Sequence, residues 1–481
     1  MEKRIIFKRT VLICLGGLLA GCVTPISLKK ESNSTPANYR TSNAEFQAAD
    51  SSNIAKINWK QYFKDTTLIA LIDTALMKNQ ELNIALREIE ISKNEIRARK
   101  GEYLPFVDIG AAAGTEKTGR FTRYGAVDEN LDIKPGTSFP EPFNDYHVGL
   151  TASWEVDIWN KLRHAKKAAV LRYLASVEGR NFMITSLIAE IANSYYELMA
   201  LDNLLDIINQ SVKIQTNGFE IVQQQKAAAK VTQLAVNRFE AQLLNTQNLR
   251  YEIRQRIVQT ENRIRFLTGG SATIVSRNPV AFNNIALDSA YAGIPSQLLA
   301  NRPDIRQAEL QLKAANIDVK VARANFFPSF RITAGAGFQA FNLTYLLKPE
   351  SMLYSLTGDL VAPLVNRNAI IAAYKNSAAR QIQEVYNYER TILNAYVEVL
   401  NQLSMVSNTA SSYKTKDKEV DILMHSITIA NSLFSSARAD YLEVLLTQRE
   451  ALESKMELVE IKMKQMNAKV NIYRALGGGW N

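Results

Sequence analysis

The 481-residue sequence has few of the nitrogen and sulfur side chains that bind transition metals or form disulfides: two cysteines and three histidines. The histidines are His147, His164 and His425, which lie far apart, and neither an HExxH motif nor a Cys/His ligand spacing is present. We therefore expect no metal site, no catalytic residues and no dissociable cofactor. The composition argues against an enzyme.

The sequence also lacks long hydrophobic runs. After residue 22 no stretch has eighteen consecutive apolar residues, so no transmembrane helix is predicted. The formal net charge is +10, of which the first 21 residues contribute four basic minus one acidic charge, leaving +7. Basic residues alternate with glutamates along the chain without forming a basic tract, so we expect no nucleic-acid partner.

The N-terminus has the pattern of an export signal. Residues 1–21 combine a basic start with a short apolar run, and Leu19-Ala20-Gly21-Cys22 has the form of a bacterial lipobox. Cleavage there removes Cys14 and leaves Cys22, which would carry diacylglycerol and an N-acyl chain, as the only cysteine, so no disulfide forms within a subunit. Residues 22–58 are predicted to be a lipidated polar tether. The alternative is an ordinary signal peptide with an incidental cysteine.

Two proline-free stretches predict unusually long helices. From 160 to 225 and from 231 to 268, apolar residues recur at steps of three and four, and the second stretch ends at Gly269-Gly270, a helix-stop signal. The first helix would be about 100 Å long. Helices of this length indicate a coiled-coil bundle rather than a compact domain.

Period-2 alternation predicts four strands, at about 105–115, 145–158, 328–341 and 352–365. In the second strand, Glu155 and Asp157 share a polar face that we expect to line a water-filled lumen. Four strands cannot close a barrel, and an open sheet would leave backbone groups unsatisfied in lipid. Strands from several subunits must therefore combine. The alternative is a small soluble sheet with one wet face.

The chain contains an internal repeat. "LPFVDIGAAAG" at 104–114 returns as "FPSFRITAGAG" at 327–337, with Pro105 and Pro328 placed 223 residues apart at helix-to-strand corners. The alternative interpretation of both residues is a loop proline. Near the ends of the two copies, Leu267 pairs with Leu476. The repeats are predicted at 59–270 and 295–481, joined by a linker at 271–294.

The repeat carries a resemblance to a known family. The block "NRPDIRQAELQLKAANIDVKVARANFFPSFRITAGAGF" at 301–338 and the end "NIYRALGGGW" at 471–480 resemble the TolC-like outer-membrane efflux proteins. With its lipobox, the chain is similar to the lipoprotein factors of resistance-nodulation-division (RND) pumps, the NodT-like branch. The resemblance runs from about Trp59 to Trp480. It implies an α+β membrane protein, a homotrimer whose twelve strands form one β-barrel in the bacterial outer membrane.

The resemblance also implies that the helices continue the barrel as a periplasmic tunnel. Its expected partners are a periplasmic membrane-fusion adaptor, an inner-membrane RND pump and outer-membrane lipid. Within the most recognisable block, Arg302-Pro303-Asp304 has the pattern of a helix start, with proline in the first turn and an acid at the positive end of the helix dipole. We interpret these three residues as structural.

The family typically closes its tunnel at the tips of helical hairpins with carboxylates and ion pairs. The long helices reverse near 224–232 and 435–443. The resemblance therefore makes Asp440 the candidate gate acid, with Arg438 as its partner and with Lys226 and Lys230 on the other tip. The alternative is that these are charged residues on a solvated helix turn.

The predicted function is an outer-membrane channel that passively conducts substrates from an adaptor and an inner-membrane pump to the exterior. Two alternatives remain: the exit duct of a type I protein-secretion system, and a non-conducting structural envelope lipoprotein. The sequence leaves open whether the substrates are drugs, metal ions or peptides, because the pump upstream makes most of the selection.

Overall fold

The protein is described by a computed structural model for residues 26–32, 36, 38–40, 45–46, 53–270, 275–277, 282, 293–436 and 438–480. The signal peptide and Cys22 lie outside the described residues. The chain divides into two compact units. The sheet unit takes residues 1–30, 90–174 and 310–386, and the hairpin unit takes residues 31–89, 175–309 and 387–481.

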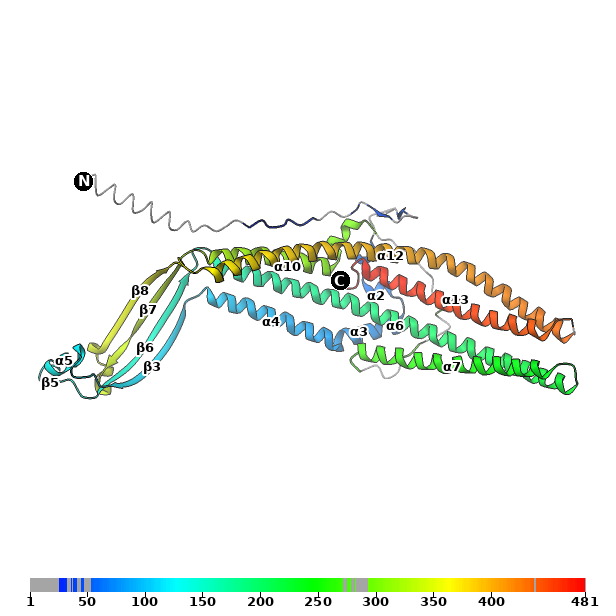
Figure 1. Ribbon diagram of the computed structural model, residues 1–481, viewed down its shortest axis with the longest axis horizontal. Coiled ribbons are helices and arrows are strands. Elements are labelled where there is room, and N and C mark those ends of the chain that lie inside the picture. Colours follow the sequence, from blue (N-terminus) through cyan, green and yellow to red (C-terminus); the bar gives the residue numbers. More distant parts are fainter. Residues whose placement is uncertain are drawn as a thin grey trace. The chain divides into compact units, whose positions relative to one another are not determined.

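The sheet unit contains four antiparallel strands in the order β3-β6-β7-β8, so β3 and β8 are its edges (Figure 1). Their bounds are β3 Phe106–Glu116, β6 Phe143–Val156, β7 Ser329–Ala340 and β8 Met352–Val361. The prediction carried the last strand to 365. β8 ends earlier because Pro363 follows, and proline has no N–H to donate to the next strand.

Both connections within strand pairs contain short elements. Between β3 and β6 lie α5 (Arg123–Asn130), β4 (Asp132–Lys134) and β5 (Thr137–Ser138). Between β7 and β8 lie α11 (Leu343–Leu346) and η3 (Pro349–Ser351).

Four helices connect to the strands: α4 (Gln80–Glu102), α6 (Lys161–Ala227), α10 (Pro303–Ala324) and α12 (Asn368–Ser435). α4 leads into β3 and α10 into β7, whereas α6 follows β6 and α12 follows β8. In the sheet unit, Phe326, just after the end of α10, packs edge-on against Tyr374 of α12 within a buried apolar cluster that includes Val319 and Ala322. Among the described residues, none of the helices is apolar enough over a sufficient length to cross a membrane.

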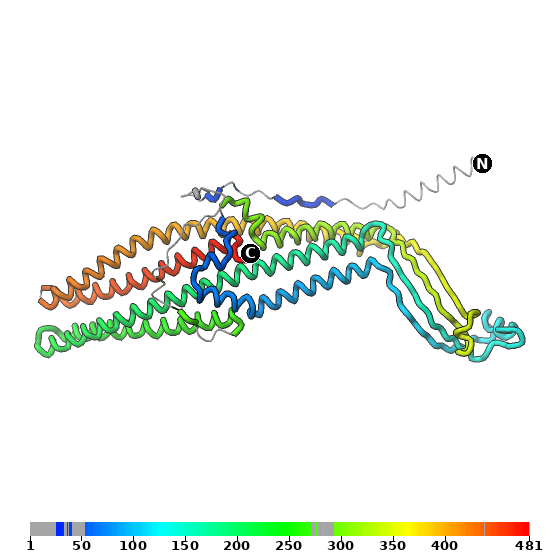
Figure 2. Tube along the Cα trace, turned by 180° about the vertical axis from the view of Figure 1, so that it is seen from behind, coloured from blue at the N-terminus to red at the C-terminus, as the bar shows by residue number. Residues whose placement is uncertain are grey.

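Two helical hairpins dominate the hairpin unit. The first joins α6 to α7 (Gln233–Leu267), and the second joins α12 to α13 (Tyr441–Ala475). The two repeats match closely in length, with 67 and 68 residues in the long helices and 35 in each returning helix. Figures 1 and 2 show both hairpins from opposite sides. The prediction of a four-stranded sheet with very long helices is confirmed.

The hairpin unit also contains short elements. These are β1 (Tyr39–Arg40), β2 (Glu45–Phe46), η1 (Ile54–Lys56), α2 (Trp59–Tyr62), α3 (Thr66–Lys78), η2 (Pro295–Gln297) and α9 (Leu298–Asn301). Asp65 caps α3 by accepting hydrogen bonds from the Thr67 and Leu68 N–H groups. Tyr195 on α6 donates its hydroxyl to the same carboxylate at 2.9 Å, which joins α3 to α6.

The described part of the N-terminal segment, which the sequence predicts to be a polar tether, contacts α12. In the sheet unit, the Lys29 ammonium lies 3.8 Å from the centre of the Tyr386 ring, and the Lys29 carbonyl accepts a hydrogen bond from Gln381 at 2.9 Å. In the hairpin unit, Tyr39 is buried and stacks on Tyr396, with ring centres 5.6 Å apart. The described part of residues 26–40 is therefore bound to α12.

The two repeats end their last helices in the same way, but one residue out of the predicted alignment. Each helix closes with three backbone bonds from successive N–H groups, Thr268, Gly269 and Gly270 in one repeat and Leu476, Gly477 and Gly478 in the other. The offset is 476 − 268 = 208, so Leu267 corresponds to Ala475 and not to Leu476. The sequence alignment missed this because leucine matched leucine.

Candidate functional site

The cross-strand register gives the sheet one polar and one apolar face. One row across the four strands consists of Asp108, Thr151, Gly335 and Ser355, and the adjacent row consists of Ile109, Leu150, Ala336 and Tyr354. On the apolar face, Ile109 is 79% exposed and Tyr354 is 80% exposed. Large apolar side chains on an uncovered sheet face fit a lipid environment.

Acidic residues outnumber basic ones on the polar face. Arg331 lies between Glu155 and Asp359 in one cross-strand row. Asp145 accepts two hydrogen bonds from the Gln339 amide, at 2.9 and 3.0 Å, and Glu155 pairs with Lys161 at 2.5 Å. The acids on this face are Asp108, Glu116, Asp145, Glu155 and Asp359. A face of this kind suits contact with water and favours cations.

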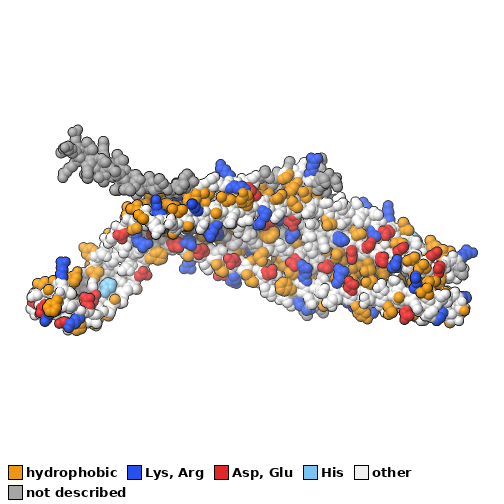
Figure 3. Space-filling view, in the orientation of Figure 1, with side chains coloured by type: hydrophobic (Ala, Val, Ile, Leu, Met, Phe, Trp, Pro, Cys, Tyr) orange, Lys and Arg blue, Asp and Glu red, His pale blue; other side chains and the backbone are white. Residues whose placement is uncertain are grey.

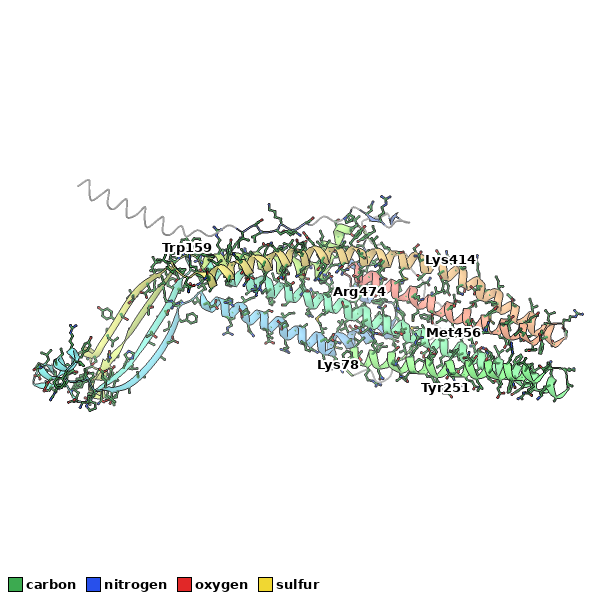
Figure 4. The ribbon with its side chains drawn as sticks, viewed as in Figure 1. Lys78, Trp159, Tyr251, Lys414, Met456 and Arg474 are labelled. Atoms are coloured by element: carbon green, nitrogen blue, oxygen red, sulfur yellow. The ribbon has the colours of Figure 1, made fainter. Side chains whose placement is uncertain are left out.

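Pro105 and Pro328 lie where a helix gives way to a strand. Pro105 stands between the end of α4 and β3, and Pro328 between the end of α10 and β7. Pro105 is exposed, whereas Pro328 is buried and its carbonyl accepts a hydrogen bond from the Trp159 indole at 2.7 Å. Trp159 also stacks on Phe327, with ring centres 4.7 Å apart. Figure 4 labels Trp159 at this junction.

The prediction that Asp157 lies on the polar strand face is wrong. We expected its side chain beside Glu155 on the lumen face, but β6 ends at Val156 and Asp157 is buried. Its carboxylate accepts hydrogen bonds from the N–H groups of Leu162 at 3.0 Å and Arg163 at 2.9 Å. Asp157 therefore caps the first turn of α6, because helix N-termini leave N–H groups without partners.

The two hairpin tips turn with matching backbone geometry. The Lys230 N–H donates to the Gln225 carbonyl at 2.9 Å, and the Arg438 N–H donates to the Leu433 carbonyl at 2.8 Å. Lys230 and Arg438 therefore occupy equivalent positions at the repeat offset of 208. Thr232 and Asp440 follow as the N-cap residues of α7 and α13.

The candidate gate residues differ in what they contact. Lys226 donates a hydrogen bond to the side chain of Gln233 within the first tip. Arg438 and Asp440 are exposed, and within the described residues no ion pair joins them. Whereas Thr232 caps its helix with its hydroxyl, the Asp440 side chain makes no capping hydrogen bond. The Asp440 carboxylate is thus available at the end of the hairpin.

Just behind the tips lies an apolar cluster that the sequence analysis did not identify. Val222, Phe239 and Leu445 are buried there, so the cluster joins the first hairpin to the second. Partly buried aromatic residues pack against it from both hairpins, namely Phe219, Phe434 and Tyr441. This cluster holds the two tips together and so positions the candidate gate residues.

Arg302 does more than begin a helix. Its side chain is 6% exposed and bonds to Asp304 at 2.7 Å, to Glu398 at 2.8 Å and to the Ala475 carbonyl at 2.7 Å. Arg474 binds the same Glu398 carboxylate. Burial opposes the charge on Arg302, but the bonds to Asp304 and Glu398 outweigh it and raise the pKa of the guanidinium. Pro303 is the first residue of α10.

A second, half-buried cation was not predicted. Arg277 lies in the inter-repeat segment, most of which is outside the described residues. It bonds to Asp202 of α6 at 2.5 Å and to Glu261 of α7 at 2.7 Å. Burial opposes its charge, yet the hydrogen bonds to Asp202 and Glu261 raise its pKa. Arg277 therefore binds its described part of the inter-repeat segment, residues 275–277, to the first hairpin. Over the part of the chain that the structure describes, no three His, Cys, Asp or Glu side chains are placed to hold a metal ion.

Comparison with known proteins identifies this architecture. The family described as outer membrane efflux protein matches residues 71–270 and 294–478, which is most of both repeats. The chain belongs to the outer membrane efflux protein family. The resemblance inferred from "NRPDIRQ" and the C-terminal "ALGGGW" is thereby confirmed, and the protein is an efflux component of the outer membrane.

Named relatives of this outer membrane efflux protein cover nearly its whole length. The solvent efflux pump outer membrane protein SrpC of Pseudomonas putida is 28% identical over 468 residues, covering 96% of this chain and 97% of SrpC. The probable outer membrane lipoprotein SilC of Salmonella typhimurium is 27% identical over 472 residues, covering 96% and 97%. The cation efflux system protein CusC of Escherichia coli K12 is 24% identical over 467 residues, covering 97% and 98%.

Solved structures share the fold. A membrane protein from Pseudomonas aeruginosa superposes with a TM-score of 0.84 at 23% identity, over 95% of this chain and all of that one. The open state of the MtrE outer membrane channel of Neisseria gonorrhoeae superposes with a TM-score of 0.82 at 22% identity, over 96% and 99%. The efflux protein therefore has the fold of an outer-membrane channel with a helical tunnel.

Proposed function

We propose that this efflux protein works as a homotrimeric duct that conducts substrates passively from a periplasmic adaptor and an inner-membrane pump to the exterior. One observation carries the proposal: the four-stranded sheet has a lipid-compatible face, a polar face and two open edges, β3 and β8. An open edge is not tolerated in lipid, because its backbone groups have no partners there.

Closure requires other copies of the chain. β3 and β8 run in opposite directions, so β8 of one copy can pair antiparallel with β3 of the next. Three copies give twelve strands in a closed β-barrel whose polar faces line the lumen. No catalytic step is needed for this role, and the pump supplies the energy.

Exposed apolar residues on the helices support the same assembly. On α7, Leu244, Tyr251 and Val258 follow one another at intervals of seven residues and are 58%, 61% and 48% exposed. A heptad stripe left open on a long helix needs a partner helix. Figure 4 labels Tyr251, and Figure 3 shows hydrophobic side chains spread over the surface of the long helices. A second copy of the chain would cover this stripe.

The hairpin tips provide the gate in this proposal. Threefold assembly brings three copies of Asp440 and Arg438 together, where facing charges control entry to the tunnel. The Asp440 carboxylate, which makes no capping bond, can exchange between Arg438 and the adaptor. Lys226 and Lys230 on the other tip complete the charged rim.

The substrate is set upstream in this proposal. Relatives at 24–28% identity are named for solvent and for cation efflux, although both match this chain over nearly their whole length. The duct therefore does not select strongly, and selection falls to the pump. Cys22 anchors the N-terminal segment in the outer membrane through its acyl chains, and SilC, named as a probable lipoprotein, supports this assignment.

Cross-linking between the edge strands tests the assembly. Cysteines in place of Ile109 on β3 and Leu356 on β8 are three strand spacings and two residues apart within one sheet, about 16 Å. A bifunctional maleimide of about half that span should therefore join only neighbouring copies and produce covalent dimers and trimers. The matched control, with cysteines in place of Val148 and Phe338, places both on paired central strands and should give monomers. Monomers from both variants would contradict the proposed closure.

A further inference from the structure

Basic side chains accumulate on two helices of the sheet unit immediately below the strands. α6 has no acidic residue from its start at Lys161 until Glu178, and over its last fifteen residues α10 has one, Asp318. Four of the basic residues define what we call the basic belt: Lys166, Lys167, Lys320 and Arg323. Among the described residues, none of the four forms an ion pair.

The basic belt lies on one side of the helices. On the other side, Arg172 of α6 forms an ion pair with Asp318 of α10. Burial raises the pKa of the Asp318 carboxyl, while Arg172, Arg380 of α12 and Arg99 of α4 act against this shift. Charges from three neighbouring helices thus converge on Asp318. On α6 this side also carries Lys161, about 20° from Arg172 around the helix axis, and the ion pair of Lys161 with Glu155 of the polar sheet face turns this side towards the tunnel in the proposed trimer.

Helix geometry places the basic belt on the opposite side. At about 100° per residue, the belt residues point between about 120° and 160° away from Arg172 or Asp318 on their own helices. Side chains from both helices also meet there. Burial lowers the pKa of His164 of α6, and the nearby charges of Lys320 on α10 and Lys167 on α6 lower it further, whereas Asp157 acts in the opposite direction. Lys167, Lys320 and Arg323 are exposed and Lys166 is half-buried, so the belt is an accessible surface on both helices.

The level of the basic belt matches the membrane boundary. Lys166 and Lys167 lie within about 10 Å of the start of α6, and Lys320 and Arg323 within about 6 Å of the end of α10. Between these helix ends and the strands stands the Trp159–Phe327 stack, and Trp159 is 44% exposed. Aromatic residues mark the interfaces of membrane-spanning strands. The headgroup layer of a bilayer is about 5–7 Å thick on each side, within reach of lysine side chains at this level.

We propose that the basic belt binds the phosphate headgroups of anionic phospholipids in the periplasmic leaflet of the outer membrane. The inference rests on the proposed function, because it requires the strands to cross that membrane. Three copies of the belt would place twelve positive charges in a ring around the base of the barrel. Juxtamembrane clusters of lysine and arginine attract anionic lipid in this way. The ring fixes the depth of the barrel independently of the acyl anchor.

Lipid retention tests this proposal. The full-length protein is reconstituted in nanodiscs of phosphatidylethanolamine and phosphatidylglycerol at 9:1, re-extracted in mild detergent and analysed for bound lipid by mass spectrometry. We expect phosphatidylglycerol to be retained severalfold above its 1:9 bulk ratio. The variant K166Q/K167Q/K320Q/R323Q should retain lipid at the bulk ratio. A control variant that removes four exposed lysines of the hairpin unit, K213Q/K414Q/K418Q/K464Q, should behave as wild type.

Equal enrichment in the belt variant and in wild type would overturn the proposal, as would loss of enrichment in the control variant. A belt variant that loses affinity for isolated peptidoglycan but not for phosphatidylglycerol would assign the surface to the cell wall and also overturn it. Ion conductance of each variant is measured in parallel. A belt variant that conducts normally but loses lipid enrichment supports the proposal. A wild-type protein that conducts but shows no lipid enrichment refutes lipid binding by the basic belt and leaves the proposed channel function unaffected.

Discussion

The Arg302 cluster makes the sharpest prediction about stability. Replacing Arg302 with methionine keeps the bulk of the side chain but leaves Asp304, Glu398 and the Ala475 carbonyl without the guanidinium. Removing one member of a buried ion pair costs about 3–5 kcal/mol, because the remaining charge stays buried and unpaired. Two remaining contacts reduce this destabilisation: Glu398 still pairs with Arg474, and Asp304 still accepts a hydrogen bond from the Ile305 N–H. We therefore expect a cost near the lower bound, about 3 kcal/mol.

The matched control is a surface ion pair in the same unit. Arg263 is 57% exposed and pairs with Glu190, which is 41% exposed. Exposed pairs contribute only about 0–1 kcal/mol, because water screens both charges. Replacing Arg263 with methionine should therefore leave stability nearly unchanged.

Amide hydrogen exchange is the appropriate assay, because a protein of this size does not unfold in a single step. The readout is exchange in the last turn of α13, whose C-cap adjoins Arg302 through the Ala475 carbonyl. A cost of about 3 kcal/mol raises local exchange about 100-fold. An R302M rate within about threefold of the R263M rate would refute the reasoning that the buried cluster holds the end of α13 in place.

Three further predictions follow from other parts of the protein. Replacing Asp440 with alanine should raise the ion conductance of the reconstituted channel severalfold, because the gate loses its carboxylate; an unchanged conductance contradicts the gate assignment. Because the pKa of His164 is lowered from its usual value of about 6.5, the unfolded state binds the proton more readily, so stability should fall as the pH drops below 6.5 towards the folded-state pKa. The H164Q variant should lose that component of the pH dependence in thermal unfolding, and a profile identical to wild type contradicts it. Gly477 (φ +90°) and Gly270 (φ +80°) both adopt a left-handed backbone conformation, but of the two only at Gly477 would a Cβ meet a backbone oxygen, that of Asn301 at 2.5 Å. In denaturant unfolding, G477A should therefore lower the free energy of unfolding by about 1–3 kcal/mol more than G270A does. Equal losses would contradict the close approach at Gly477.

Much of the fold was predictable because its signals are local. Side-chain alternation from Val148 to Val156 predicts a strand, and the proline-free stretch after Asn160 predicts a helix. Neither prediction requires knowledge of a distant contact. The same local signal failed at Asp157. The alternation continues there in the sequence, but the backbone turns to let the carboxylate cap α6.

The contacts that could not be predicted join distant parts of the chain. Arg302 forms an ion pair with Glu398, 96 residues away, and Tyr39, in the segment predicted to be a polar tether, stacks on Tyr396. The tip cluster around Phe239 also depends on how two hairpins meet. Packing across hundreds of residues leaves no periodic mark in a single sequence. The gate role of Asp440 and the lipidation of Cys22 remain predictions.

The most direct measurement of the central claim is the current through single complexes of the full-length protein in a planar lipid bilayer, with the mass of the complex determined in the same preparation. The account predicts a complex of three chains and discrete conductance steps that favour cations over anions, because the polar sheet face carries more acidic than basic residues. It also predicts larger or more frequent steps from the D440A variant. A trimer that conducts nothing in either form, or a protein that stays monomeric in lipid, would contradict the account.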